Sequence, residues 1–333
     1  MAAAMEVVGN PSSVHAEGRA AKGLMESARA SIAAALGADG ADVIFTSGAT
    51  EAAALVLAGR GLACAGVEHD AVGAWCEATL TCDSFGRVAV PDPARATLQL
   101  ANSETGVVQA LPAELWASDL TQAFGKIPFA FNWLNITAGF VSAHKLGGPK
   151  GIGALILRPG TDLAAQLKGG GQEMGRRAGT ENLIGIAGFA AAATRAMERL
   201  ATGDWARVAE LRTILENGLA EAERNAMFPG SAPEGVPDGP ARLPNTTCVI
   251  APGWRGETQV MAMDLAGFAV SAGAACSSGK VRASRVLGAM GYDETLAGSA
   301  LRVSLGIETT RAEVDAFLRA WGKASARHRA RHG

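Results

Sequence analysis

The first clear pattern in this chain is a helical repeat of apolar positions over residues 16–36, followed by a strand-like run at residues 42–46. Apolar side chains that recur every three to four residues share one face of a helix. The members of this face are Leu24, Ala28, Ile32, Ala35 and Leu36. Glycines end the helix, the apolar run after them is typical of a short buried strand, and a second helix is expected to open within residues 47–51.

Strand-like runs recur further along the chain, with helical or loop segments between them. They cover residues 97–100, 138–142 and 152–157. Alternation of this kind predicts an α/β fold with a mostly parallel central sheet.

The pattern changes near residue 200, where we expect a domain boundary. The later segments are helices at residues 183–200, 208–226 and 257–266, strands at 246–250 and 300–305, and a Pro/Gly-rich loop at 229–244. Thr310 and Glu313 form a capping box at the start of a last amphipathic helix. The prediction is therefore a large domain over residues 12–200 and a smaller α+β domain over 201–333, with residues 1–11 packing near the smaller one.

Composition and charge exclude several classes of protein. The formal net charge of −2 over 333 residues gives no sign of binding to nucleic acid or to an anionic membrane. The strongly apolar helical run at residues 183–193 is too short to span a bilayer, and the first residues lack an export signal. The five cysteines are Cys64, Cys76, Cys82, Cys248 and Cys276. They are scattered without a CxxC pair, so neither a metal site nor a disulfide framework is expected, and a cytoplasmic location fits best.

Candidate chemistry begins at Lys145, which ends an apolar run and precedes a Gly-Gly-Pro turn. A lysine packed among small residues loses hydration, which favours its nucleophilic free amine. Such an amine can form a Schiff base with pyridoxal phosphate (PLP). A surface lysine at a strand end is the alternative.

Cys276 lies in a run of nine residues, 271–279, whose other members are all small, which predicts an exposed loop with a reactive thiol rather than a packed core. Arg302 interrupts an apolar strand, and a charge there needs a partner: a substrate carboxylate or a structural ion pair.

Three further segments carry weaker signals. Residues 47–50 join a strand to a helix and could hold a phosphate on backbone N–H groups, although an ordinary helix cap would look the same. Asp119 could keep a pyridine nitrogen protonated, with Gln122 near the ring hydroxyl, or it could be a solvated loop acid. His69 could stack on a cofactor and move protons, or be structural.

Taken together, these stretches resemble the cysteine desulfurases of the NifS/IscS type, within the class V aminotransferase group. The matching stretches are residues 9–15 (GNPSSVH), 45–51 (FTSGATE), 68–69 (EH), 104–106 (ETG), 121–126 (TQAFGK), 142–145 (SAHK), 176–180 (RRAGT), 242–245 (RLPN), 274–278 (AACSS) and 302–306 (RVSLG). They follow the family order over nearly the whole chain.

The resemblance implies a fold-type I PLP-dependent transferase that converts L-cysteine to L-alanine and passes the sulfur to iron–sulfur cluster or thiolation pathways. It implies that Lys145 forms the Schiff base, that His69 carries protons over the ring and that Cys276 receives the sulfur as a persulfide. The implied cofactor contacts are Ala49, Thr50, Ser103, Asp119, Gln122, Ser142, His144 and Thr180, the last from the second subunit of a homodimer. The implied substrate contacts are Asn102 and Arg302. A sulfur-acceptor protein is the implied partner.

The chain departs from the family pattern at several places. It begins just after the position of the family's first short strand, and Ser103 stands where the family usually has a second Asn. Two alternatives therefore stay open: a selenocysteine or cysteine-sulfinate lyase on the same fold, and a PLP-binding partner protein with weak or no activity. Dependence of turnover on Cys276 would separate the first alternative from a desulfurase.

Overall fold

A computed structural model of the chain describes residues 1–232, 239–273 and 283–332. At its centre is a sheet with the strand order β1-β6-β5-β4. The strands are β1 (Asp42–Thr46), β4 (Ala117–Asp119), β5 (Ala138–Ser142) and β6 (Gly153–Leu157). Further strands are β2 (Ala63–Ala65), β3 (Glu77–Leu80), β7 (Thr246–Ile250) and β8 (Ala300–Ser304).

The predicted α/β class is confirmed, and the central sheet is mixed. β4 and β5 are parallel, as are β2 and β3, and parallel bridges at Thr97–Ala117 and Ala63–Ala96 connect the two pairs. β6 is antiparallel to both β1 and β5, so the prediction of a mostly parallel sheet fails at this strand. Residues 97–100 contribute such a bridge rather than one of the regular strands.

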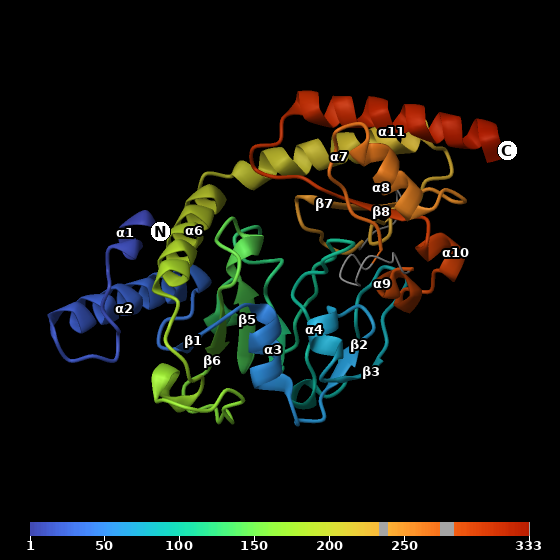
Figure 1. Ribbon diagram of the computed structural model, residues 1–333. Coiled ribbons are helices and arrows are strands. Elements are labelled where there is room, and N and C mark those ends of the chain that lie inside the picture. The colour runs from blue at the N-terminus through green and yellow to red at the C-terminus, as the bar shows by residue number, and fades with distance from the viewer. Residues whose placement is uncertain (233–238, 274–282, 333) are drawn as a thin grey trace.

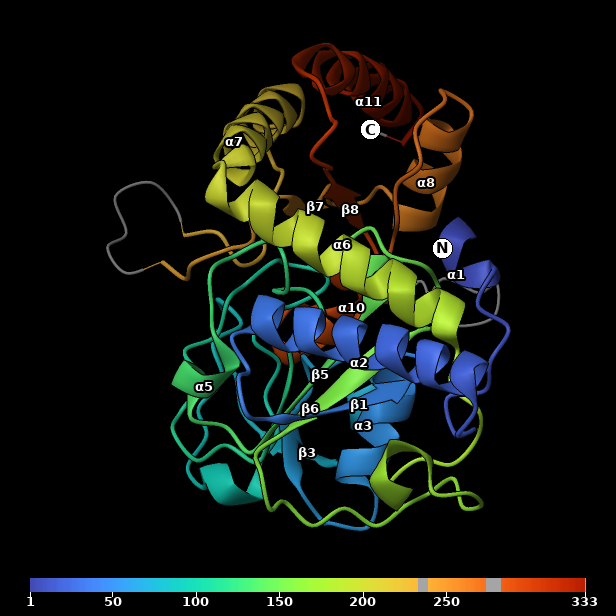
Figure 2. The same cartoon turned by 90° about the vertical axis from the view of Figure 1, so that its left-hand side faces the viewer.

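The sheet is the middle of three layers. Alternate residues of β1 show this, because Val43 and Phe45 face one core cluster while Ile44 faces another. The first cluster lies under α2 (Ala16–Leu36) and α6 (Leu183–Ala201), which cross the sheet side by side in Figure 2. The second lies under α3 (Ala49–Leu57). The period-two burial of the strand thus fixes which helix covers which face.

A separate core is formed by later parts of the chain. It joins the antiparallel pair of β7 and β8 to α7 (Asp204–Ala222), α8 (Gly256–Asp264) and α11 (Arg311–His332). Figure 1 shows α7 and α11 above this strand pair, on the side away from the central sheet. The predicted boundary near residue 200 stays a proposal. α1 (Ala2–Met5) packs against α6.

The remaining helices are short. They are α4 (Asp70–Gly73), α5 (Phe131–Leu134), α9 (Arg285–Ala289) and α10 (Glu294–Ala297), with 3-10 turns η1 (Pro93–Arg95), η2 (Ala143–Lys145) and η3 (Gln172–Gly175). Within the part of the chain that the structure describes, no helix has the length and apolar character needed to cross a membrane.

Most helix predictions hold, and the predicted capping box is present. In α11 the N–H of Glu313 donates to the Thr310 hydroxyl at 3.2 Å, and the Glu313 carboxylate accepts from the Thr310 N–H at 2.7 Å. α7 begins four residues earlier than predicted, because Gly203 takes a left-handed backbone conformation and starts the helix at Asp204.

Candidate active site

The turn between β1 and α3 lies directly against the end of β5. The backbone N–H of Ala49 donates a 2.7 Å hydrogen bond to the hydroxyl of Ser142. A Cβ at Gly48 would lie 3.3 Å from that hydroxyl, and one at Gly153 would lie 2.7 Å from the Cα of Gly48, so glycine is required for this close approach. Thr50 is exposed in the first turn of α3. The N-terminus of α3 therefore has a hydroxyl beside it, an arrangement that suits a phosphate-binding site.

Lys145 lies in η2, one turn beyond the end of β5. The side chains of Lys145 and its neighbour His144 are both exposed, so the expected dehydrating pocket is absent around this lysine among the described residues. The pKa of His144 is lowered by partial burial and by the positive charges of Lys145 and Lys150.

Asp119 ends β4, the parallel neighbour of β5, and therefore lies at the same edge of the sheet as η2. Burial raises its pKa, while the hydrogen bond from the Thr121 N–H at 2.8 Å and the charges of His69 and Lys145 oppose that rise. Asp119 therefore interacts electrostatically with a histidine and a lysine that are distant from it in the sequence.

His69 caps the N-terminus of α4 and is exposed. Its Nδ1 accepts from the N–H of Ala71 at 3.1 Å, which leaves Nε2 to carry the ring proton. Its neighbour Glu68 is only 1% exposed and was given no role by the sequence. Burial raises the pKa of Glu68 well above its usual value, and the nearby Asp119 carboxylate acts in the same direction.

A second group that the sequence did not indicate is Lys126. It is 7% exposed, and its ammonium donates to the backbone oxygen of Gln122 at 3.0 Å and to the side-chain Oε1 of Gln122 at 3.4 Å. The only sequence signal was its place in the TQAFGK stretch, which says nothing of burial. Gln122, the predicted contact of the ring oxygen, therefore has a buried cation as the hydrogen-bond partner of its side chain.

Both polar atoms of the Asn102 side chain make hydrogen bonds within the protein. Its Oδ1 accepts from the backbone N–H groups of Glu104 and Thr105 and from the Thr105 hydroxyl, and its Nδ2 donates to the Val67 carbonyl at 3.0 Å. The side chain is 2% exposed, and its predicted contact with the substrate stays a proposal.

Arg302 reaches that loop from β8. Its Nη1 donates to the carbonyl of Ser103 at 2.9 Å, which joins β8 to the loop that holds Asn102 and Ser103. Its Nε is buried and has no hydrogen-bond partner among the described residues. A buried donor without a partner costs about 1–3 kcal/mol, so a ligand acceptor here would be stabilising. Ser103 itself is half-buried.

Thr180 lies in the exposed stretch between η3 and α6. That stretch is fixed to the sheet domain by ion pairs of Arg176 with Asp42 at 2.6 Å and of Arg177 with Glu51 at 2.8 Å.

Cys276 lies outside the described residues. The residues that precede and follow residues 274–282 are firmly held. Ser271 and Arg302 exchange two backbone hydrogen bonds, at 3.1 and 2.7 Å, and the hydroxyl of Ser284 donates to the Glu104 carboxylate at 2.5 Å.

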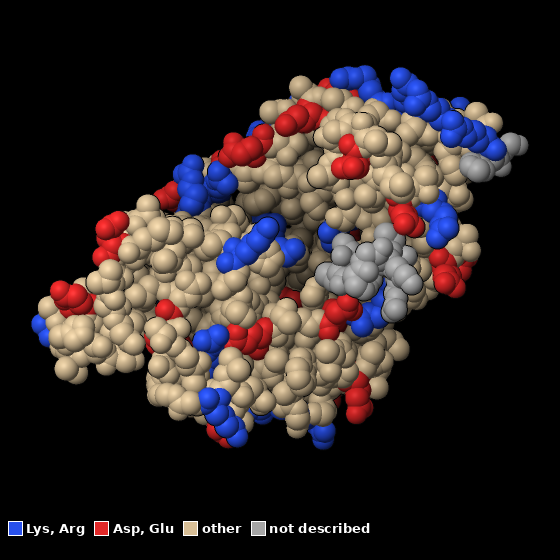
Figure 3. Space-filling model, viewed as in Figure 1, with Lys and Arg blue, Asp and Glu red and all other residues tan. Residues whose placement is uncertain are grey.

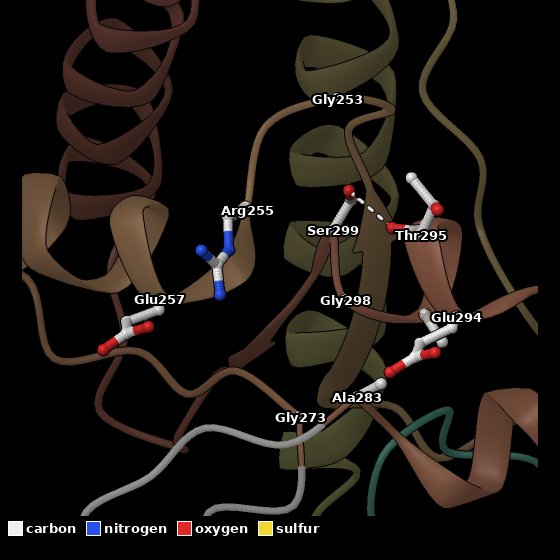
Figure 4. Close-up of a pocket in the computed structure, with 10 residues that line it drawn as sticks. Gly253, Arg255, Glu257, Gly273, Ala283, Glu294, Thr295, Gly298 and Ser299 are labelled. Atoms are coloured by element: carbon white, nitrogen blue, oxygen red, sulfur yellow. Dashed lines mark hydrogen bonds between the residues drawn. The ribbon is translucent and has the colours of Figure 1, made fainter.

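The surface of the described residues has two concave features of interest. Figure 3 shows a depression between the part that carries α7, α8 and α11 and the part below it, with Lys and Arg side chains at its edge. A cavity of about 620 Å³ lies in the later part of the chain. Its lining includes Arg255, Glu257 and Glu294, and Gly273 and Ala283 at the borders of residues 274–282 (Figure 4).

Known proteins resemble this chain over most of its length. The model of the class-V aminotransferase family matches residues 2–72 and 66–317. A cysteine desulfurase from Cereibacter sphaeroides is 37% identical over 94% of this chain and 87% of its own length. The crystal structure of a NifS-like protein from Rickettsia africae superposes with a TM-score of 0.86 at 29% identity, covering 97% of this chain and 93% of that protein. A structure of SspA in complex with cysteine superposes with a TM-score of 0.72 at 26% identity, covering 92% and 93%.

Proposed function

The chain belongs to the class-V aminotransferase family and, within it, to the cysteine desulfurases, and from this premise we propose that it uses PLP to transfer the sulfur of L-cysteine to Cys276. The observation that carries the proposal is the common edge of β4 and β5, where the Ala49–Ser142 cradle, Asp119 and Lys145 lie together.

The residues at this edge fit PLP. The glycine-lined approach of α3 to Ser142 suits the phosphate, with Ala49, Thr50, Ser142 and His144 around it. Asp119 would face the ring nitrogen, and the Thr121 hydrogen bond supports its ionised form. Gln122 would meet the ring oxygen, His69 would stack on the ring, and Lys145 would hold the cofactor covalently. When bound, PLP supplies an aldehyde and a ring that accepts electrons.

The chain's own residues then bind and orient the substrate. Arg302 would hold the carboxylate of L-cysteine, because its buried Nε is open to an acceptor and Arg matches a carboxylate in shape. The Ser103 carbonyl fixes the guanidinium. His69 would hold a proton at Nε2 next to the reacting atoms. Orientation of this kind can contribute about 7–11 kcal/mol to lowering a barrier.

The sulfur transfer balances without an added oxidant. The Cys276 thiolate attacks the substrate sulfur, an S–S bond forms, and the bond between sulfur and the substrate carbon breaks. The electrons of that bond stay on carbon, which takes a proton and leaves as alanine. The enzyme keeps a persulfide on Cys276, which we propose is passed to a sulfur-acceptor protein.

The test is an absorption titration of the purified protein with PLP, followed by L-cysteine, for the wild type, Lys145→Ala and Cys276→Ala. A visible band that Lys145→Ala lacks is the expected result, with alanine formed, and sulfide released by added dithiothreitol, only when Cys276 is present. A band without turnover would instead indicate a PLP-binding protein. Release of selenium or sulfinate that does not need Cys276 would indicate a related lyase.

We further propose that Thr180 acts in the site of a second copy. Mixed dimers of a Lys145→Ala chain and a Thr180→Val chain test this. If Thr180 acts across the interface, one site of the mixed dimer has both residues and recovers activity that neither parent dimer has. If Thr180 serves its own chain, every site stays defective.

A further inference from the structure

Lys126 is a buried cation without a counter-ion in the described structure. Its side chain is 7% exposed, and none of the ion pairs of the described residues includes it. Its ammonium donates to Gln122, to the backbone oxygen at 3.0 Å and to Oε1 at 3.4 Å. Burial of an ammonium group without a carboxylate partner is unfavourable. The presence of the Lys126 ammonium beside Gln122 therefore calls for an explanation.

The contact with Oε1 fixes which way the Gln122 amide faces. An ammonium group can only donate hydrogen bonds, so the oxygen of the amide must face Lys126. Because the amide is planar, its NH₂ group then points away from Lys126. Without the ammonium, the amide could turn over and present its oxygen instead.

We propose that Lys126 is a positioning residue that makes Gln122 a hydrogen-bond donor toward an acceptor oxygen on the cofactor ring. The inference rests on the proposed function, and it adds a residue to the site and a direction to the bond. The charge of Lys126 also polarises the amide, and in a buried setting this strengthens the N–H donor. A ring oxygen that receives such a bond is favoured in its deprotonated form.

The environment of Lys126 suits this role at neutral pH. Burial, and to a lesser extent the charge of Lys145, lowers the pKa of Lys126 to about 8. The ammonium form therefore still prevails near neutrality. Two contacts fix the adjoining turn. The indole N–H of Trp205 donates to the Gly125 carbonyl at 2.7 Å, and Ala196 lies so close that a Cβ at Gly125 would be 2.7 Å from it.

A double-mutant cycle on the full-length protein tests the proposal. The apparent dissociation constant of PLP is measured from its visible absorbance for the wild type, Lys126→Met, Gln122→Leu and the double variant. Lys126→Met is expected to weaken binding by about tenfold in the wild-type background. In the Gln122→Leu background the same change should have less than about a twofold effect, because there is no amide left to orient.

A second arm identifies the atom on the ligand. With 3-deoxypyridoxal phosphate, which lacks the ring hydroxyl, the wild type and Lys126→Met should bind with equal affinity. Lys323→Met, an exposed lysine on α11, is the matched control and should behave as the wild type with both ligands.

Equal losses from Lys126→Met in both backgrounds, or an equal loss with the deoxy ligand, would overturn the positioning role. Failure of the wild type to bind PLP at all would instead overturn the proposed function. Circular dichroism of each apoprotein separates these results from misfolding, and Lys126→Met, which removes a buried charge, is expected to fold.

Discussion

The hydroxyl of Ser142 accepts a hydrogen bond from the backbone N–H of Ala49 at 2.7 Å, across 93 positions of sequence. One residue ends β5 and the other begins α3, so the bond joins the strand that leads to Lys145 to the helix that offers its N-terminus. The two stretches proposed to hold the phosphate are therefore one structural unit, and displacement of either moves the other.

Replacement of Ser142 by alanine should weaken PLP binding by about fivefold. The substitution removes one hydrogen-bonding hydroxyl and leaves the Ala49 N–H without its partner, a loss of about 1 kcal/mol. The measurement is the PLP titration followed by visible absorbance. Ser27→Ala, an exposed serine of α2, is the control and should leave the affinity unchanged. An unchanged PLP affinity in Ser142→Ala would show that Ser142 does not contribute to phosphate binding.

Arg302→Lys should lower kcat/KM for L-cysteine by about 30-fold, mainly through KM. Lysine keeps the charge but lacks the planar pair of donors that matches a carboxylate, and it cannot keep the Ser103 contact in the same geometry. PLP affinity should change little. Arg311→Lys, at an exposed ion pair with Asp315, is the control. A loss of PLP affinity equal to the loss of kcat/KM would assign Arg302 to cofactor binding instead.

Glu173→Gln should destabilise the fold by about 3 kcal/mol. Glu173 is buried, accepts from Arg29 at 2.8 and 2.9 Å and from the Phe45 N–H at 2.9 Å, and holds the stretch before Thr180 onto β1. Removal of its charge leaves Arg29 without its buried partner. Glu26 is the other carboxylate paired with Arg29, and its side chain is 49% exposed. Glu26→Gln should therefore lower the free energy of unfolding by less than about 1 kcal/mol. Denaturant unfolding measures both, and equal effects would show that burial is not decisive.

The stability of the apoprotein should rise with pH because of Lys126. Burial lowers its pKa from 10.5 to about 8, so between these values the unfolded chain binds more protons than the folded one. The free energy of unfolding is then expected to gain up to about 3 kcal/mol over that interval. Lys126→Met should lack this gain, while Lys323→Met should keep it. Parallel pH profiles for the wild type and Lys126→Met, from urea unfolding, would contradict the assignment.

Local patterns of the sequence predicted the elements that depend on local interactions. α2 and the capping box of α11 follow from periodicity and from side chains three residues apart. The direction of β6 does not, because pairing between distant strands leaves no local signal. The burial of Lys126 also depends on distant residues, since Ala196 and Trp205 enclose the turn that precedes it.

The site shows the same division. The sequence identified Lys145, Asp119 and His69, and in the structure Asp119 interacts electrostatically with both of the other two. The sequence predicted Lys145 in a dry pocket, whereas the lysine is exposed. It also predicted that Asn102 contacts the substrate, and in the structure Oδ1 of that side chain accepts from the turn that follows while Nδ2 donates to the Val67 carbonyl. Motif spacing located the groups, and packing decided their accessibility.

The chain on either side of residues 274–282 is anchored by two different kinds of contact. Ser271 exchanges backbone hydrogen bonds with Arg302, whereas the Ser284 hydroxyl donates to the side chain of Glu104. Because only the second contact depends on a partner side chain, a substitution at Glu104 would loosen one border of residues 274–282 and leave the other in place.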